Sequence, residues 1–171
     1  MDNPVVLRVT EVCGALGFAT LRFNFRGVGS STGAHDEGRA EVRDVEAALG
    51  HLRDALGSGT PLALAGYSFG AIVAARVPAT GTPFGDLAGL ALIAPPLGLS
   101  SEEPFAELGW FSGPLLVAAG SQDEYCPLPA LDTLAQRLPG AMVKVIDGAN
   151  HFFAWAGLLE AGKTRRSGRA G

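Results

Sequence analysis

The stretch that decides the fold reads Pro61-Leu-Ala-Leu-Ala-Gly66-Tyr67-Ser68-Phe69-Gly70-Ala-Ile-Val-Ala-Ala75. Mostly apolar residues lead into a Gly-x-Ser-x-Gly pentapeptide, and small apolar residues follow it. This order predicts a strand, a sharp turn and a helix, with the hydroxyl of Ser68 held above the end of the strand. We expect both glycines of the pentapeptide at positions where a side chain would collide with the neighbouring strand and helix.

Such a turn would place a nucleophile next to an anion-stabilising group. Ser68 is the candidate nucleophile. The amide of Phe69 would lie at a helix N-terminus, where unpaired N–H groups favour negative charge, so it is the candidate oxyanion donor. The bare pentapeptide is also compatible with a glycine-rich connection whose serine only caps the helix. The flanking strand and helix patterns favour the nucleophile.

The composition is typical of one domain with a large interior. The chain has 171 residues, of which 47% are hydrophobic and 18% charged, and its mean hydropathy is +0.24. Strands that are apolar throughout suit a parallel sheet covered by helices on both faces. We therefore expect one domain over residues 1–160 and a basic, disordered tail over residues 161–171.

Charge and cysteine usage argue against several classes of protein. The net charge is −4, and four basic residues lie beyond residue 162, which leaves −8 for residues 1–162. An acidic body argues against a nucleic-acid partner. The two cysteines, Cys13 and Cys126, make no disulfide framework or zinc spacing, and Cys13 is expected to be a core thiol. The apolar runs are too short or too interrupted for a membrane span, and no signal peptide opens the chain, so we expect a cytoplasmic protein.

Helical and strand patterns alternate along the chain. Strands are expected at residues 18–25, 61–65, 87–94, 114–119 and 142–146. Helices are expected at residues 4–16, 36–56, 69–77 and 128–138, and residues 147–153 are expected to lead into a final helix that reaches about residue 160. The first helix would be capped by Asp2 or Asn3, with Pro4 at its first position. We therefore expect a three-layer α/β/α sandwich with a mainly parallel sheet of about five strands.

Three chemically active residue types each follow the end of a different expected strand. They are Ser68, Asp123 and His151. The carboxyl ends of parallel strands meet at one edge of a sheet, and we expect the three side chains to meet there. A serine hydroxyl needs a base within hydrogen-bond reach, and His151 is the candidate base. The alternative is a packed loop histidine beside Phe152 and Phe153.

The acid that would orient His151 has three candidates. Asp123 ranks first and its neighbour Glu124 second. Asp147 ends the last strand and is expected to fix the turn before His151, as aspartate often does. The other two histidines are not candidates for the base: His51 lies off the apolar stripe of its helix, and His35 lies in a loop with no evident partner.

The order Ser, Asp, His with this strand–turn–helix motif resembles the α/β-hydrolase superfamily. Three segments are similar to a branch of small bacterial hydrolases related to dienelactone hydrolases: residues 21–29, 66–70 and 148–153. The resemblance covers about Met1 to Glu160. It implies a serine hydrolase in which Ser68 is the nucleophile, His151 the base and Asp123 the acid, with the Phe69 amide as one oxyanion donor. The implied reaction is cleavage of an ester, thioester or lactone without a metal or organic cofactor.

The given sequence departs from this family at its start. Relatives usually carry a further strand and a glycine-containing loop just before the segment that matches Met1-Asp-Asn-Pro-Val-Val6. That loop supplies the second oxyanion donor in the family. We therefore expect an incomplete oxyanion hole in a shortened protein, or a true start upstream of Met1.

Two other functions stay open. The departure favours a catalytically impaired hydrolase fold that serves as a binding or interaction module. A nucleotide-binding protein is suggested by Gly27-Val-Gly29-Ser-Ser-Thr-Gly33, but the spacing misses G-x-G-x-x-G and no acidic residue ends the next strand. The expected partner is a small-molecule acyl substrate, without nucleic acid or membrane, and a homo-oligomer is left open.

Overall fold

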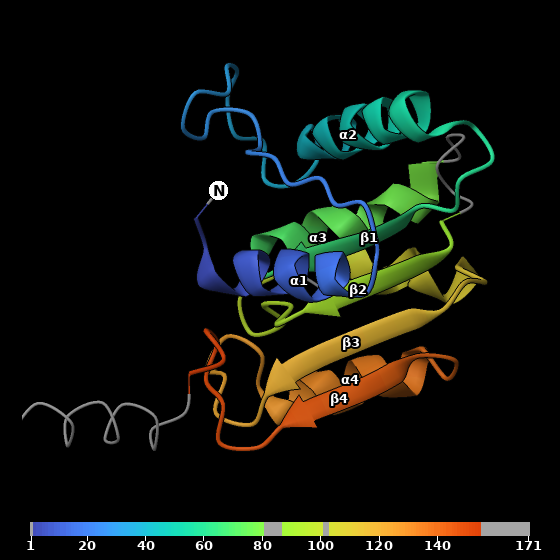
Figure 1. Ribbon diagram of the computed structural model, residues 1–171. Helices are drawn as coiled ribbons and strands as arrows, with labels where there is room; N and C mark the ends of the chain where they lie inside the picture. The colour runs from blue at the N-terminus through green and yellow to red at the C-terminus, as the bar shows by residue number, and fades with distance from the viewer. Residues whose placement is uncertain (1, 81–86, 101–102, 155–171) are drawn as a thin grey trace, which may run out of the picture.

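A computed structural model describes residues 2–80, 87–100 and 103–154 of the chain. Within these residues, helices and strands alternate (Figure 1). The α-helices are α1 (Pro4–Ala15), α2 (Glu41–Leu56), α3 (Phe69–Arg76) and α4 (Leu128–Arg137). The strands are β1 (Ala63–Tyr67), β2 (Gly89–Ile93), β3 (Leu115–Gly120) and β4 (Met142–Ile146). Two 3₁₀ helices complete the described elements, η1 (Val77–Thr80) and η2 (Glu103–Trp110).

The four strands form one parallel sheet in the order β1-β2-β3-β4. The sequence prediction of an α/β fold with a parallel sheet is therefore confirmed. Helix α1 lies on one face of the sheet, and α3 and α4 lie on the other (Figure 1). Because all four strands run in the same direction, the loops that follow them gather at one edge, which we call the carboxyl edge.

The core lies on the α3 and α4 face of the sheet. The strand residues Leu90, Leu92 and Val117 point to this face and are buried. Helix α4 packs there through Leu131, Leu134 and Leu138, as its periodicity predicts. A second cluster joins α2 to α3 through apolar residues that include Val42, Val45, Leu49 and Val73.

The prediction of a strand over residues 18–25 is wrong. The described sheet has four strands, and this segment belongs to none of its ladders. A strand exists only with a neighbour that accepts its backbone hydrogen bonds, and β1 pairs with β2 alone. The segment instead packs by its side chains, because Phe23 and Phe25 lie against the cluster that joins α2 to α3.

The apolar stripe of α1 is less buried than its periodicity predicts. The N-cap is as expected, since the side chain of Asn3 accepts a hydrogen bond from the amide of Val5 at 2.9 Å and Pro4 follows it. Val5 is the one buried residue of this helix, whereas Val12 and Leu16 are exposed and Cys13 is only half-buried. Amphipathic spacing identifies the helix but cannot show how much of its stripe finds a partner.

Helix α2 begins later than predicted, at Glu41 rather than Asp36. The carboxylate of Glu41 accepts hydrogen bonds from the amides of Asp36 at 2.8 Å and Gly38 at 2.9 Å. These bonds hold the preceding residues in a turn, in which Glu37 and Gly38 have positive φ values of 51° and 86°. Residues 103–110, which lie outside every predicted helix and strand, form η2. The predicted last helix beyond Ala154 and the predicted tail lie outside the described residues.

Candidate active site

Ser68, Asp123 and His151 meet at the carboxyl edge of the sheet. Ser68 directly follows β1, Asp123 lies in the loop after β3, and His151 lies in the loop after β4. His151 Nε2 lies 2.9 Å from Ser68 Oγ. His151 Nδ1 lies 2.9 Å from both carboxylate oxygens of Asp123. The histidine and the aspartate are buried, with 7% and 4% of their surfaces exposed, whereas Ser68 is half-buried.

The chemistry of the three groups indicates how the protons are shared between them. An ionised carboxylate can only accept, so His151 Nδ1 carries the proton and donates it to Asp123. In the neutral imidazole Nε2 is then an acceptor, and the hydroxyl of Ser68 donates to it. The arrangement orients the histidine so that it can take the serine proton.

The turn at Ser68 has a strained backbone. Ser68 has φ 53° and ψ −117°, a positive φ that non-glycine residues rarely adopt. A Cβ at Gly66 would overlap the carbonyl group of Gly70, so the close approach of α3 to β1 requires glycine at residue 66. The matching expectation for Gly70 is wrong, because a Cβ there would meet nothing within 4 Å. Gly70 contributes its backbone carbonyl to the close approach, whereas a side chain at residue 70 would point into open space.

The loop after β3 fixes the carboxylate. The amides of Tyr125 and Cys126 donate to Asp123 Oδ1 at 2.9 Å and 3.1 Å. Glu124, the second candidate acid, is exposed. Asp147 accepts a hydrogen bond from Ser121 Oγ at 3.1 Å, and this hydroxyl accepts from the amide of Gly148 at 2.8 Å. Asp147 therefore fixes the turn before the histidine loop, and Asp123 is the acid that contacts His151.

Aromatic rings surround the imidazole of His151. The ring centroid of Tyr125 lies 4.8 Å from that of His151, and the ring of Tyr67 lies at 5.3 Å. Phe152 lies at 5.6 Å, edge to face. Sequence reasoning missed the two tyrosines, although Tyr67 belongs to the pentapeptide and Tyr125 follows the acid by two residues.

Gly120 is a second positioning residue that sequence reasoning missed. It ends β3, and a Cβ there would overlap the carbonyl of Ala149. The missing side chain lets the loop that carries His151 pack directly against the strand that leads to Asp123. A glycine at a strand end just before a candidate acid is a signal that could have indicated this approach.

The chain offers no competing nucleophile at this edge of the sheet among the cysteines that the structure describes. Cys126 is fully buried. Burial and the nearby Asp123 charge raise the pKa of the Cys126 thiol to about 12, against a smaller opposing effect of a hydrogen bond with the Leu97 backbone. The group is therefore a neutral thiol at physiological pH, and the hydroxyl of Ser68 is the group that contacts His151 Nε2.

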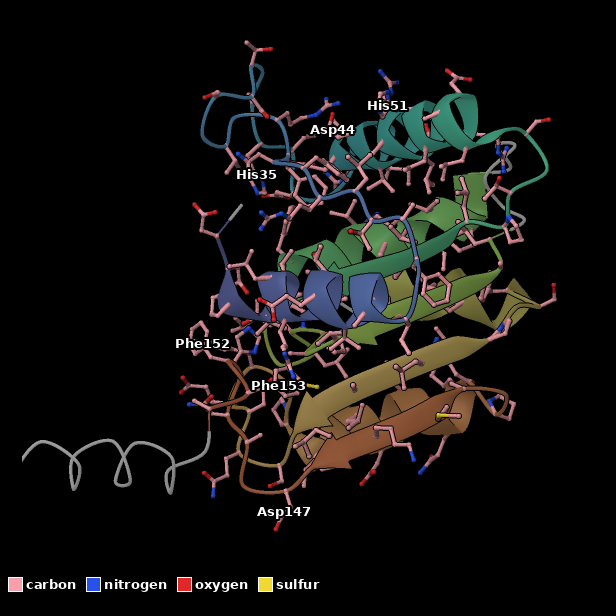
Figure 2. All side chains as sticks on the ribbon, in the orientation of Figure 1. His35, Asp44, His51, Asp147, Phe152 and Phe153 are labelled. Carbon is pink, nitrogen blue, oxygen red and sulfur yellow. The ribbon has the colours of Figure 1, made fainter. Side chains whose placement is uncertain are left out.

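The amide of Phe69 occupies the first position of α3, as expected for an oxyanion donor. Its ring packs against Phe25 at 5.6 Å and against His35 at 5.0 Å. The expectation that His35 has no partner is wrong, because its Nδ1 lies 2.9 Å from the buried carboxylate of Glu41. His51, in contrast, lies exposed on α2, as predicted (Figure 2).

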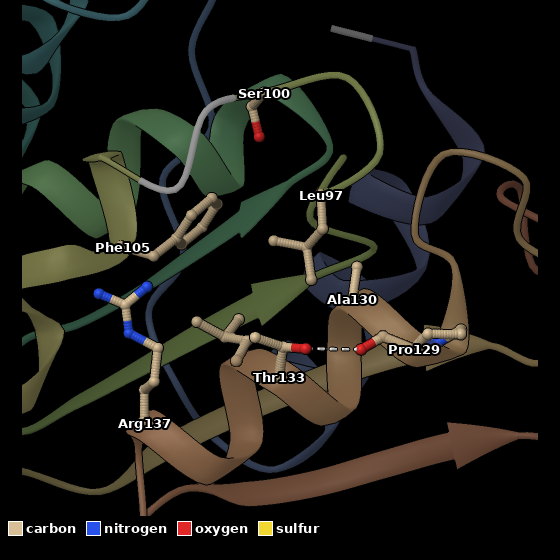
Figure 3. Close-up of a pocket in the computed structure, with 8 residues that line it drawn as sticks. Leu97, Ser100, Phe105, Pro129, Ala130, Thr133 and Arg137 are labelled. Carbon is tan, nitrogen blue, oxygen red and sulfur yellow. Dashed lines mark hydrogen bonds between the residues drawn. The ribbon is translucent and has the colours of Figure 1, made fainter.

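A cavity of about 320 Å³ lies between α4 and the segment that follows β2 (Figure 3). Apolar residues such as Leu97, Phe105 and Leu134 line it, and Arg137 lies at one end. Gly98, which follows Leu97 in the chain, donates from its amide to the carbonyl of Tyr125 at 2.9 Å. One wall of the cavity is therefore attached to the loop that carries Asp123.

Metal and membrane features are not found in the described ranges. No group of three or more histidine, cysteine, aspartate or glutamate side chains in residues 2–80, 87–100 and 103–154 could hold a metal ion. In the same part of the chain, none of the helices has the length and apolar character needed to cross a bilayer.

A parallel α/β sheet with a serine on a strained strand-to-helix turn, beside a hydrogen-bonded histidine and aspartate, is the arrangement of the α/β-hydrolase class. The chain belongs to the alpha/beta hydrolase family, whose model matches residues 9–125.

Individual relatives agree with this assignment. The chain is 30% identical over 161 residues to the uncharacterized protein RP471 of Rickettsia prowazekii (strain Madrid E), and the match covers 91% of the chain and 66% of that protein. It is 36% identical to the structure of an alpha-beta serine hydrolase homologue from Coxiella burnetii, with a TM-score of 0.79 and coverage of 96% and 75% of the two chains. It is 31% identical to XC6422 from Xanthomonas campestris, an α/β serine hydrolase without a lid, with a TM-score of 0.78 and coverage of 100% and 77%.

Proposed function

We propose that this protein is a serine hydrolase that cleaves a carboxylic ester, thioester or lactone through an acyl-enzyme. The observation that carries the proposal is the continuous hydrogen-bonded chain from Ser68 through His151 to Asp123. The solved relatives from Coxiella burnetii and Xanthomonas campestris, described as serine hydrolases or their homologues, support it. The three segments that resemble the dienelactone-hydrolase-related branch favour a small acyl substrate.

The proposed first step forms the acyl-enzyme. Ser68 Oγ attacks the substrate carbonyl while His151 Nε2 takes the hydroxyl proton. The negative charge that develops on the carbonyl oxygen is stabilised by the amide of Phe69. Asp123 stabilises the imidazolium through Nδ1–H. The tetrahedral intermediate then collapses, and His151 gives its proton to the leaving alcohol, thiol or hydroxyl group.

The proposed second step releases the acid. Water attacks the acyl-Ser68 carbonyl as His151 again acts as base, and the returning proton regenerates the serine hydroxyl. This cycle uses no metal or organic cofactor. The alternative, a hydrolase fold that only binds its partner, keeps the same geometry but forms no covalent bond at Ser68.

Labelling with a fluorophosphonate probe tests the proposal against this alternative. The wild-type chain should be labelled, and Ser68→Ala and His151→Ala should not. Ser58→Ala, exposed in the turn before β1, and His51→Ala, exposed on α2, are the matched controls, and both should be labelled like the wild type. If the folded wild-type chain is not labelled, or if Ser68→Ala keeps full labelling, the proposed mechanism is wrong.

A further inference from the structure

The hydroxyl of Tyr67 links the nucleophile's strand to the loop that carries the base. Tyr67 is the last residue of β1 and directly precedes Ser68. Its hydroxyl donates a hydrogen bond to the backbone carbonyl of His151 at 3.2 Å. We infer that Tyr67 is a positioning residue that holds His151 in register with Ser68, an inference that rests on the proposed function.

Apart from the contact of His151 Nε2 with Ser68 Oγ, the other hydrogen bonds of the histidine loop in the described residues run to the loop after β3, to the end of β4 or within the loop itself. Its first half is held by the loop after β3, where the amide of Gln122 donates to the carbonyl of Ala149 at 2.9 Å. Its second half is bonded to itself, since Asn150 Oδ1 accepts from the amides of Phe152 and Ala154 at 3.0 Å and 3.1 Å. These bonds fix the loop relative to Asp123. The bond from Tyr67 fixes it relative to the strand that carries Ser68.

Tyr67 keeps its proton at physiological pH. Burial raises its pKa, the side chain of Asn3 opposes this effect in part, and the nearby charge of Asp123 raises the pKa further. The neutral hydroxyl can therefore donate to the His151 carbonyl. The ring itself also packs on the imidazole, with an interplanar angle of 37°.

Tyr67→Phe removes the hydroxyl and keeps the ring. We expect the rate of fluorophosphonate labelling of Ser68 to fall about ten-fold, the usual scale for one lost hydrogen bond in a site. Thr60→Val is the matched control, because it also removes a hydroxyl that donates to a backbone carbonyl, at 2.9 Å, at the opposite end of β1. Thr60→Val should be labelled at the wild-type rate.

A spectroscopic readout separates positioning from general stability. The proton that His151 Nδ1 donates to Asp123 should give a low-field signal in the proton NMR spectrum. In Tyr67→Phe we expect this signal to broaden or disappear, while the rest of the spectrum remains that of a folded protein. In Thr60→Val it should be unchanged. A sharp, unshifted signal together with wild-type labelling in Tyr67→Phe would overturn the inference.

The low-field signal reports on His151 whether or not Ser68 reacts. An unlabelled wild type that shows the signal, with the signal lost in Tyr67→Phe, would contradict the proposed function and support the positioning role.

Discussion

At the level of single residues, two neighbouring carboxylates differ in their contact with His151. Asp123 is buried and accepts from two backbone amides and from His151, whereas its neighbour Glu124 is exposed. We predict that Asp123→Asn lowers kcat/KM for an activated ester by about a thousand- to ten-thousand-fold, because the amide favours the wrong histidine tautomer. Glu124→Gln should change kcat/KM little. Steady-state assays of both variants check this, and a large loss in Glu124→Gln alone would reverse the assignment.

The sequence predicted the three residues that meet at the carboxyl edge because each follows a strand end. Strand ends can be located from local patterns, and parallel pairing brings them to one edge. The sequence could not predict the ring contacts of Tyr67 and Tyr125 or the partner of His35. Those contacts depend on how loops fold over one another, which no local pattern reports. The catalytic roles themselves stay a prediction until activity is measured.

At the scale of elements, the turn between β1 and α3 depends on one of its two glycines. A Cβ at Gly66 would overlap the Gly70 carbonyl, whereas a Cβ at Gly70 has open space. We predict that Gly66→Ala lowers the free energy of unfolding by about 1–3 kcal/mol or more, through forced separation of strand and helix. Gly70→Ala should leave it unchanged or raise it by up to about 1 kcal/mol, since alanine favours the helix. Urea unfolding of both variants checks this, and equal destabilisation would contradict it.

The start of α2 should make stability depend on pH. Burial raises the pKa of the Glu41 carboxyl. Hydrogen bonds from backbone amides, such as those of Asp36 and Gly38, and the charge of His35 lower it. The lowering effects are larger together, so the pKa lies below its ordinary value. A carboxyl whose folded-state pKa lies below its unfolded value contributes its stability above the unfolded pKa and loses it as the pH falls through the folded pKa.

We therefore predict that Glu41→Gln is less stable than the wild type at neutral pH by about 1–3 kcal/mol, because bonds to a charged acceptor are lost. The wild type should lose this advantage as the pH falls below the ordinary carboxyl value of 4.5. Urea unfolding at neutral and acidic pH measures the difference. A difference between the two proteins that stays constant with pH would show that the Glu41 charge does not contribute.

At the scale of the whole molecule, the sequence predicted the parallel α/β sheet but overcounted its strands. Runs of apolar residues identify extended segments, while pairing between strands is a long-range property. Residues 18–25 have the composition of a strand, and in the structure they pack by their side chains without joining a ladder. The burial of α1 was overestimated for the same reason, since its partners are set by the fold.

Amide hydrogen exchange should reveal this difference between strands. The amides of β2 and β3, the two inner strands of the described sheet, should exchange most slowly. Amides of residues 19–24 should exchange much faster, because no ladder protects them. Protection of residues 19–24 equal to that of β2 would show that this segment is paired in solution.

In the proposed mechanism, Ser68, activated by His151, forms a covalent acyl-enzyme. The most direct test mixes the protein rapidly with a p-nitrophenyl ester, quenches it with acid and measures the intact mass, followed by peptide mapping. We predict a mass increase of one acyl group on the peptide that contains Ser68, and no increase in Ser68→Ala. Undiminished ester hydrolysis by Ser68→Ala, or an acyl group found only on another residue, would contradict it.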